Sequence, residues 1–102
     1  MRYAGPVAIQ RFASQDVERF FRDGRTPRRV GWANVSKTAA RKLDMLDYAG
    51  ALTDLNSPPG NRLEALKGDL RGLHSIRVND QWRIVFRWTP SGPAEVDVRD
   101  YH

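Results

Sequence analysis

The hydrophobic positions in the first half of the chain recur at helical spacing. Val17, Phe20 and Phe21 follow Ser14, a residue type that often caps helices, and they precede Gly24, a residue type that often ends them. This pattern predicts a first helix between Ser14 and Gly24.

A second helical pattern extends over residues 36–49, with Asn34 or Ser36 as the expected cap and Gly50 as the expected end. Its apolar stripe consists of Val35, Ala39, Leu43, Leu46 and Ala49. The rest of its surface carries Lys37, Arg41, Asp44 and Tyr48. A stripe of this kind predicts a helix that packs along one side against a core.

From Leu73 onward, hydrophobic and polar positions alternate, which is typical of strands. The expected strands cover residues 73–79, 82–89 and 94–100, with shorter ones at 7–12 and 63–66. The order β-α-α-β-β-β-β predicts an α+β fold in which two helices cover one face of a mainly antiparallel sheet. We expect residues 1–102 to form a single domain, of which residues 1–6 are a loose leader.

Alternation also divides the expected strands into two faces. The core face carries His74, Ile76, Val78, Trp82, Ile84, Phe86, Trp88, Val96 and Val98. The opposite face, which we call the arginine face, carries Arg77, Arg83, Arg87, Arg99 and Tyr101. Guanidinium groups bind phosphates and aromatic rings stack on bases, so this face favours single-stranded RNA. The alternative is a solvated face whose charge is offset by Glu95 and Asp97.

The charge balance points to an anionic partner. The chain has 17 basic and 12 acidic residues, a formal net charge of +5, and 14 of the basic residues are arginine. Because arginine grips phosphate with a planar fork of donors, this bias suits phosphate recognition. The alternative explanation is codon usage in a GC-rich genome.

Several kinds of chemistry are disfavoured by composition. The chain has no cysteine, which excludes disulfides and thiolate catalysis, and it has only two histidines, His74 and His102. A zinc site of His and Cys is therefore not expected, nor is a cofactor. No segment is long and apolar enough to cross a membrane, and no signal peptide is evident, so we expect a cytoplasmic protein.

Three segments of the chain resemble HigB-like toxins of the RelE/ParE superfamily: Arg62-Leu-Glu-Ala-Leu-Lys-Gly-Asp69, Ser75-Ile-Arg-Val-Asn-Asp-Gln-Trp-Arg-Ile-Val-Phe86 and Asp100-Tyr-His102. The resemblance begins near Ile9 and includes the segment Leu55-Asn-Ser-Pro-Pro-Gly-Asn61. It implies a RelE-like fold and a ribosome-dependent mRNA endonuclease. It also implies a HigA-type antitoxin with a helix-turn-helix, through which alone the toxin would reach operator DNA.

Carried over by position, the catalytic residues of the family fall on Lys67, Arg83, Asp100, Tyr101 and His102. The candidate RNA-binding residues are Arg71, Arg77, Arg87 and Arg99. Many relatives have a histidine where this chain has Glu64, so the acid–base role of that position is in doubt. The alternative for His102 is a frayed chain end without a role.

The expected chemistry needs no metal, since the 2′-OH of the RNA attacks the adjacent phosphate and leaves a 2′,3′-cyclic phosphate. Arg83 and Lys67 would stabilise the charge of the pentacoordinate phosphate. Tyr101 and His102 are candidates for proton transfer or stacking, with Asp100 orienting them.

Two rival functions remain open at this point. One is a weak or degenerate toxin that acts mainly by binding an antitoxin and regulating an operon, which the residue Glu64 keeps possible. The other is a ParE-like gyrase poison, although toxins of that kind lack the terminal Tyr-His.

Overall fold

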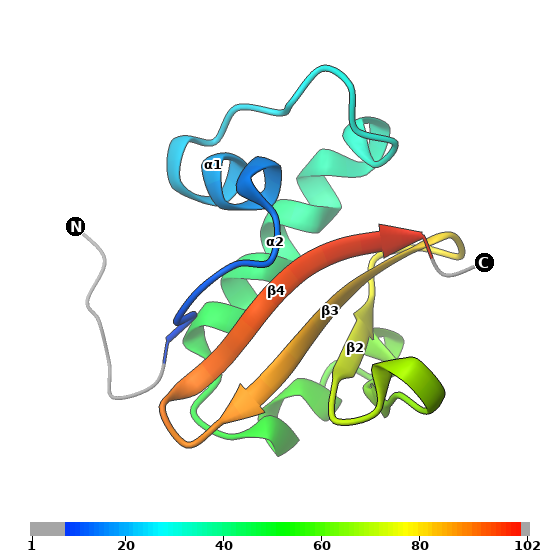
Figure 1. Cartoon of the computed structure of the whole chain (residues 1–102). Coiled ribbons are helices and arrows are strands. Elements are labelled where there is room, and N and C mark those ends of the chain that lie inside the picture. The colour runs from blue at the N-terminus through cyan, green and yellow to red at the C-terminus, as the bar shows by residue number, and fades with distance from the viewer. Residues whose placement is uncertain (1–7, 101–102) are drawn as a thin grey trace.

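The computed structural model describes residues 8–100, which form two helices and a four-stranded antiparallel sheet (Figure 1). The helices are α1 (Gln15–Asp23) and α2 (Ser36–Tyr48). The strands are β1 (Glu64–Ala65), β2 (His74–Arg77), β3 (Trp82–Thr89) and β4 (Gly92–Asp100), and they lie in the order β1-β2-β3-β4. In the view of Figure 1, α2 passes behind the sheet and α1 lies above it, next to α2 and β4, which confirms the expected α+β fold.

The ends of α1 are set by local chemistry, as the sequence predicts. The Ser14 Oγ accepts a hydrogen bond from the Val17 N–H at 3.3 Å, and this satisfies one of the free donors at the start of the helix. Gly24 adopts a left-handed conformation with φ 77°, and its N–H donates to the Phe20 carbonyl at 2.9 Å.

Helix α2 differs from the prediction at its start. Its cap is Val35, which has no side chain to accept a hydrogen bond, so the expected caps Asn34 and Ser36 are wrong. The reason is a 3-10 turn at Ala33–Val35 that runs directly into the helix.

No helix of residues 8–100 is both long and apolar enough to cross a bilayer.

The strand expected at residues 7–12 is reduced to one parallel bridge between Phe12 and Val96, and Val7 lies outside the described residues. The segment runs along β4, but β4 is irregular there. Pro93 has no N–H to donate, and Glu95 has φ 53° at a bulge. A continuous ladder therefore cannot form.

The core face of the sheet is confirmed. Ile76, Ile84, Phe86 and Val96 are fully buried against the helices, and Val78 and Val98 are nearly so. Trp82 and Trp88 are partly buried and pack against this core, as does the partly buried His74, whose ring stacks on Phe86 at 6.2 Å. The other face of the same strands is the one that carries the arginines.

Candidate active site

Three arginines form a row across the sheet on neighbouring strands. Arg77 on β2 is the direct cross-strand partner of Arg83 on β3, and Arg83 is the direct partner of Arg99 on β4. Like charges placed directly opposite each other destabilise a sheet. Three guanidinium groups at this spacing therefore favour an anion that binds among them.

The two outer arginines of the row each pair with an acidic residue. Arg77 contacts the Asp80 carboxylate at 2.5 Å, and this hydrogen bond and the arginine's charge lower the pKa of Asp80. Arg99 contacts Asp97 at 3.3 Å. The Asp80 side chain is 98% exposed, whereas that of Asp97 is only 21% exposed. An ion pair exposed to water is weak, so Arg77 can exchange Asp80 for a phosphate at little cost.

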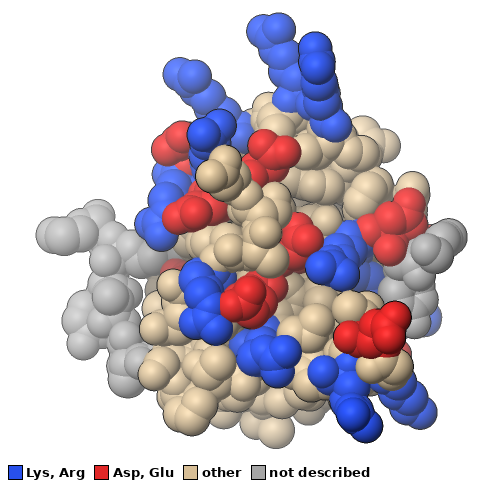
Figure 2. All heavy atoms as spheres, viewed as in Figure 1, with Lys and Arg blue, Asp and Glu red and all other residues tan. Residues whose placement is uncertain are grey.

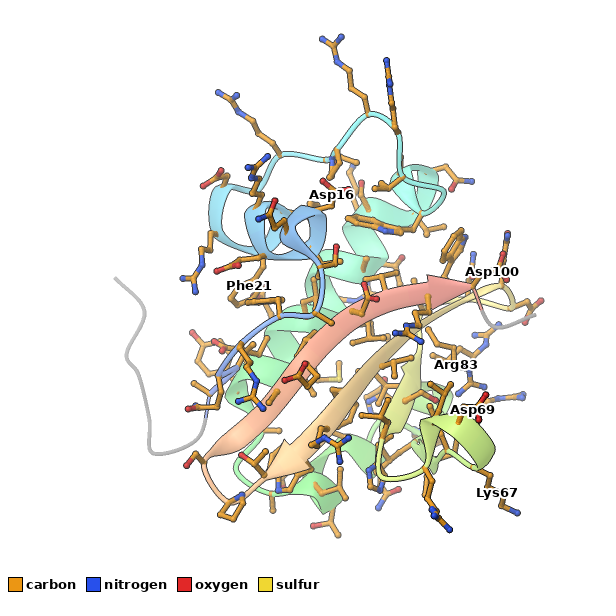
Figure 3. All side chains as sticks on the ribbon, viewed as in Figure 1. Asp16, Phe21, Lys67, Asp69, Arg83 and Asp100 are labelled. Atoms are coloured by element: carbon orange, nitrogen blue, oxygen red, sulfur yellow. The ribbon has the colours of Figure 1, made fainter. Side chains whose placement is uncertain are left out.

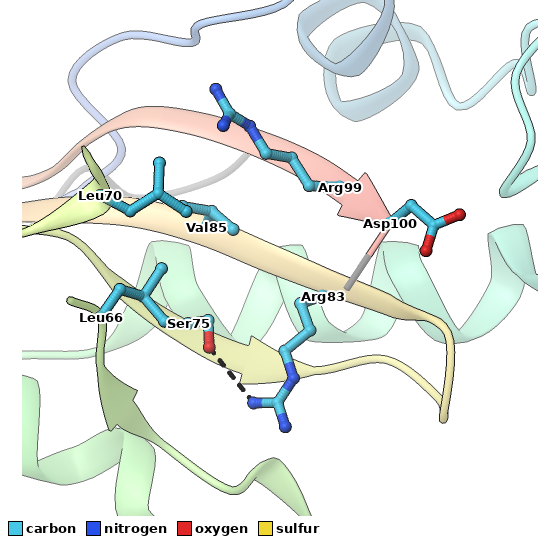
Figure 4. Close-up of a pocket in the computed structure, with 7 residues that line it drawn as sticks. All are labelled: Leu66, Leu70, Ser75, Arg83, Val85, Arg99 and Asp100. Atoms are coloured by element: carbon cyan, nitrogen blue, oxygen red, sulfur yellow. Dashed lines mark hydrogen bonds between the residues drawn. The ribbon is translucent and has the colours of Figure 1, made fainter. Parts of the chain in front are cut away.

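The central arginine is not on an open surface, contrary to the sequence prediction. Only 7% of Arg83 is exposed. The chain after β1 folds over this part of the arginine face, and Leu66 and Leu70 line a pocket together with Arg83 (Figures 3 and 4). The cavity measures about 200 Å³ and is lined by Leu66, Leu70, Ser75, Arg83, Val85, Arg99 and Asp100.

The guanidinium of Arg83 is held in one orientation by three contacts. Its Nη1 donates to the Ser75 hydroxyl and to the Arg62 carbonyl, both at 3.2 Å, and lies 3.4 Å from the Glu64 carboxylate. All three contacts are made by the same nitrogen. They keep the fork of the guanidinium in a fixed direction, which suits the binding of a phosphate.

Of the predicted residues that the structure describes, Asp100 and Arg99 line the pocket together with Arg83, whereas Lys67, Arg71, Arg77 and Arg87 do not. The Asp100 carboxylate accepts a hydrogen bond from the Gln81 amide at 3.0 Å. Lys67 is exposed on the loop after β1 and does not line the pocket (Figure 3).

The remaining predicted residues lie around the pocket or beyond the described part of the chain. Arg71 is exposed just after the 3-10 turn at Gly68–Leu70, and Arg87 is exposed farther along β3, beside Gly72. Tyr101 and His102 lie outside the described residues. Within residues 8–100, no group of three acidic, histidine or cysteine side chains could hold a metal ion.

Basic side chains gather on the surface near the pocket and also at the far end of the molecule (Figure 2). Glu95, one of the two acids expected to offset the arginine face, instead pairs with Arg11. Asp97 is therefore the one of the two acids that pairs with a predicted site residue, Arg99.

Sequence reasoning missed a buried polar pair behind the site, Lys42 and Asn61. Lys42 is 8% exposed and its Nζ donates to the Asn61 Oδ1 at 2.5 Å. Burial lowers the pKa of Lys42, and the nearby charges of Arg41 and Arg77 lower it further. The signal was in the spacing, because position 42 lies three residues after Ala39 and so falls on the buried side of the helix.

The chain resembles one described toxin family over nearly all of its length. The sequence model of the family described as the RelE-like toxin of type II toxin–antitoxin system HigB matches residues 10–102. Toxin HigB-1 of Vibrio cholerae is 43% identical over 77 residues, which cover 76% of this chain and 80% of that protein. An uncharacterised protein of Haemophilus influenzae is 37% identical over 79 residues, covering 78% and 77%.

Solved structures support the fold alone, because their sequences have diverged. A chain of the YoeB-YefM complex from Staphylococcus aureus superposes with a TM-score of 0.55 at 22% identity, covering 96% of this chain and 99% of that one. The YoeB/ParE toxin from Agrobacterium tumefaciens gives a TM-score of 0.54 at 22% identity, covering 94% and 100%.

Proposed function

Because the chain belongs to the HigB-like family of RelE-like toxins of type II toxin–antitoxin systems, we propose that it is an endoribonuclease that cuts messenger RNA on the ribosome. Its action would stop translation by destroying the message.

The observation that carries the proposal is the arginine row with a buried, oriented arginine at its centre. Arg77 and Arg99 are partly or largely exposed and can bind the phosphates on either side of the cut. Arg83 sits in the pocket between them and is fixed by Ser75 and the Arg62 carbonyl. A gyrase poison would need no such phosphate site on its sheet.

The proposed reaction is a transesterification within the RNA. The 2′-oxygen bonds to the adjacent phosphorus, the bond from phosphorus to the 5′-oxygen breaks, and the products are a 2′,3′-cyclic phosphate and a free 5′-hydroxyl. Arg83 would stabilise the negative charge that builds on the phosphate in the transition state. A donor already aimed at that position costs no reorganisation during the reaction.

The proton transfers are assigned to the end of the chain. Tyr101 and His102 are the candidates to take the proton from the 2′-OH and to give one to the 5′-oxygen. Asp100 in the pocket would orient them. Lys67 and Arg71, on the exposed loop after β1, would hold phosphates of the message outside the pocket.

We propose an antitoxin of the HigA type as the protein partner. The YoeB-YefM structures show related folds in complex with an antitoxin. In this chain the antitoxin would bind away from Arg83 and Asp100 and would block access to the ribosome. Operator DNA would be contacted through the antitoxin.

Primer extension on a translated message in a purified translation system tests the proposal. We expect new stops within the coding sequence and fragments that carry a 2′,3′-cyclic phosphate. Intact message with stalled DNA replication would favour a gyrase poison instead. Intact message together with tight antitoxin binding would favour a degenerate toxin.

A further inference from the structure

The side chain of Asn61 is a fully buried hub in the turn that follows α2. Its amide donates to the carbonyls of Leu55 at 3.1 Å and Ser57 at 3.3 Å, and it contacts the Met45 sulfur at 3.1 Å. Its oxygen accepts from the Lys42 ammonium. Both ends of the amide are therefore used, with 0% of the residue exposed.

The hub lies next to the contacts that hold Arg83. Arg62, the residue after Asn61, has the left-handed conformation φ 46°, and in it the Arg62 carbonyl receives the Arg83 Nη1. Glu64, two residues farther on, supplies the carboxylate at 3.4 Å. Two of the three contacts of Nη1 thus come from the segment that begins at Asn61.

We infer that Asn61, braced by Lys42, is a positioning residue that sets the direction of the Arg83 guanidinium. The hydrogen bonds from the Asn61 amide to the Leu55 and Ser57 carbonyls fix the conformation of the turn. The fixed turn holds the Arg62 carbonyl and the Glu64 carboxylate in place. Only the expected effect on the cleavage rate rests on the proposed function; the effect on the Arg83 guanidinium does not.

A pair of matched variants separates positioning from general loosening of the turn. Asn61→Ala removes the buried amide, whereas Asn56→Ala removes an exposed amide of the same loop. The first readout is the NMR signal of the Arg83 guanidinium, whose slow rotation reports how firmly it is held. We expect slow rotation in the parent chain and in Asn56→Ala, and fast rotation in Asn61→Ala.

The second readout is single-turnover cleavage of a translated message over a range of protein concentrations. In Asn61→Ala the rate at saturation should fall by roughly tenfold to a hundredfold, the size expected for a small misplacement of a catalytic group. The half-saturating concentration should stay the same, because Arg77, Arg99 and Lys67 keep their places.

The outcomes distinguish this inference from the proposed function. If the parent chain does not cut the message, the proposed function fails, yet the NMR comparison still decides whether Asn61 positions Arg83. Unchanged rotation in Asn61→Ala would overturn the inference, as would an equal loss of rate in Asn56→Ala.

If Asn61→Ala does not fold, Lys42→Met takes its place. That variant keeps the donors of Asn61 and removes only the brace on its oxygen. We expect the same faster rotation of Arg83 and a lower saturating rate, with an unchanged half-saturating concentration. Rotation as slow as in the parent chain would contradict the inference.

Discussion

Replacing Arg83 with alanine should separate a large loss of activity from a modest loss of stability. The change removes the three contacts of Nη1 and leaves the Ser75 hydroxyl, 1% exposed, without this partner. A buried polar group that loses its partner costs about 1–3 kcal/mol. Glu64 is less buried and can bind water instead.

The loss of charge works in the opposite direction. Arg83 lies directly opposite both Arg77 and Arg99, and relief of like-charge pairs across a sheet returns a few tenths to about 1 kcal/mol each. The two pairs together return about 0.4–2 kcal/mol, so the net cost is at most about 2.6 kcal/mol. For a domain of this size that lowers the thermal midpoint by at most roughly 10–20 °C and leaves the protein folded.

The cleavage rate should fall steeply in Arg83→Ala, although the protein stays folded. Removal of one donor aimed at a developing oxyanion lowers the rate by roughly 10²–10³-fold. The assays are thermal unfolding and primer extension on a translated message, at a temperature well below the variant's midpoint. Arg19→Ala, which removes an exposed positive charge on α1, is the matched control. It should change neither the thermal midpoint nor the cleavage rate.

Near-normal cleavage by the folded Arg83→Ala protein would refute the assignment of Arg83 to the reaction. Failure to fold would show that the contacts of Nη1 contribute far more than 2 kcal/mol to the free energy of unfolding. Arg83→Lys should also lose most activity, because a single ammonium lacks the fork that reaches Ser75 and the pocket together.

Three further predictions concern other parts of the molecule. Burial lowers the pKa of Lys42 in the folded state. At a pH between that lowered pKa and the ordinary pKa of lysine, the unfolded chain therefore binds more protons than the folded chain. The free energy of unfolding should rise with pH across this alkaline interval. Lys42→Met should lack this rise in denaturant titrations, and parallel curves for the two proteins would contradict it. Gly92→Ala should destabilise the fold by roughly 1–3 kcal/mol, because φ is 128° there and a Cβ would lie 2.3 Å from the Ala8 carbonyl oxygen; an unchanged thermal midpoint would count against this packing. Deletion of Tyr101 and His102 should abolish cleavage in primer extension while thermal unfolding and antitoxin binding persist, and full cleavage by the shortened chain would remove both residues from the proposed site.

The parts of the fold that depend on neighbouring residues could be predicted from the sequence. Ser14 and Gly24 act within one turn of helix, so the limits of α1 follow from residue type alone. The two-residue period of β3 places Ile84 and Phe86 in the core and Arg83 on the other face, and this holds for any sheet that has a covered side.

The features that depend on distant segments could not be predicted in this way. The burial of Arg83 arises because the loop carrying Leu66 and Leu70 folds over the sheet, and nothing in the alternation of β3 encodes that cover. The lost first strand depends on the bulge at Glu95, in a strand more than eighty residues later. The cap of α2 failed for a local reason, since the 3-10 turn before it competes with the side-chain cap.

The central claim, that this toxin cuts messenger RNA on the ribosome, is tested most directly by comparing one message in two states. The same transcript is incubated with the purified protein either alone or bound to translating ribosomes, and cleavage is followed by primer extension. The site holds an oriented positive charge, and the ribosome would bend the message into the in-line geometry that removes much of the barrier. We therefore expect efficient cutting of the translated message and very slow cutting of the free transcript, and equal cleavage of the two would contradict the account.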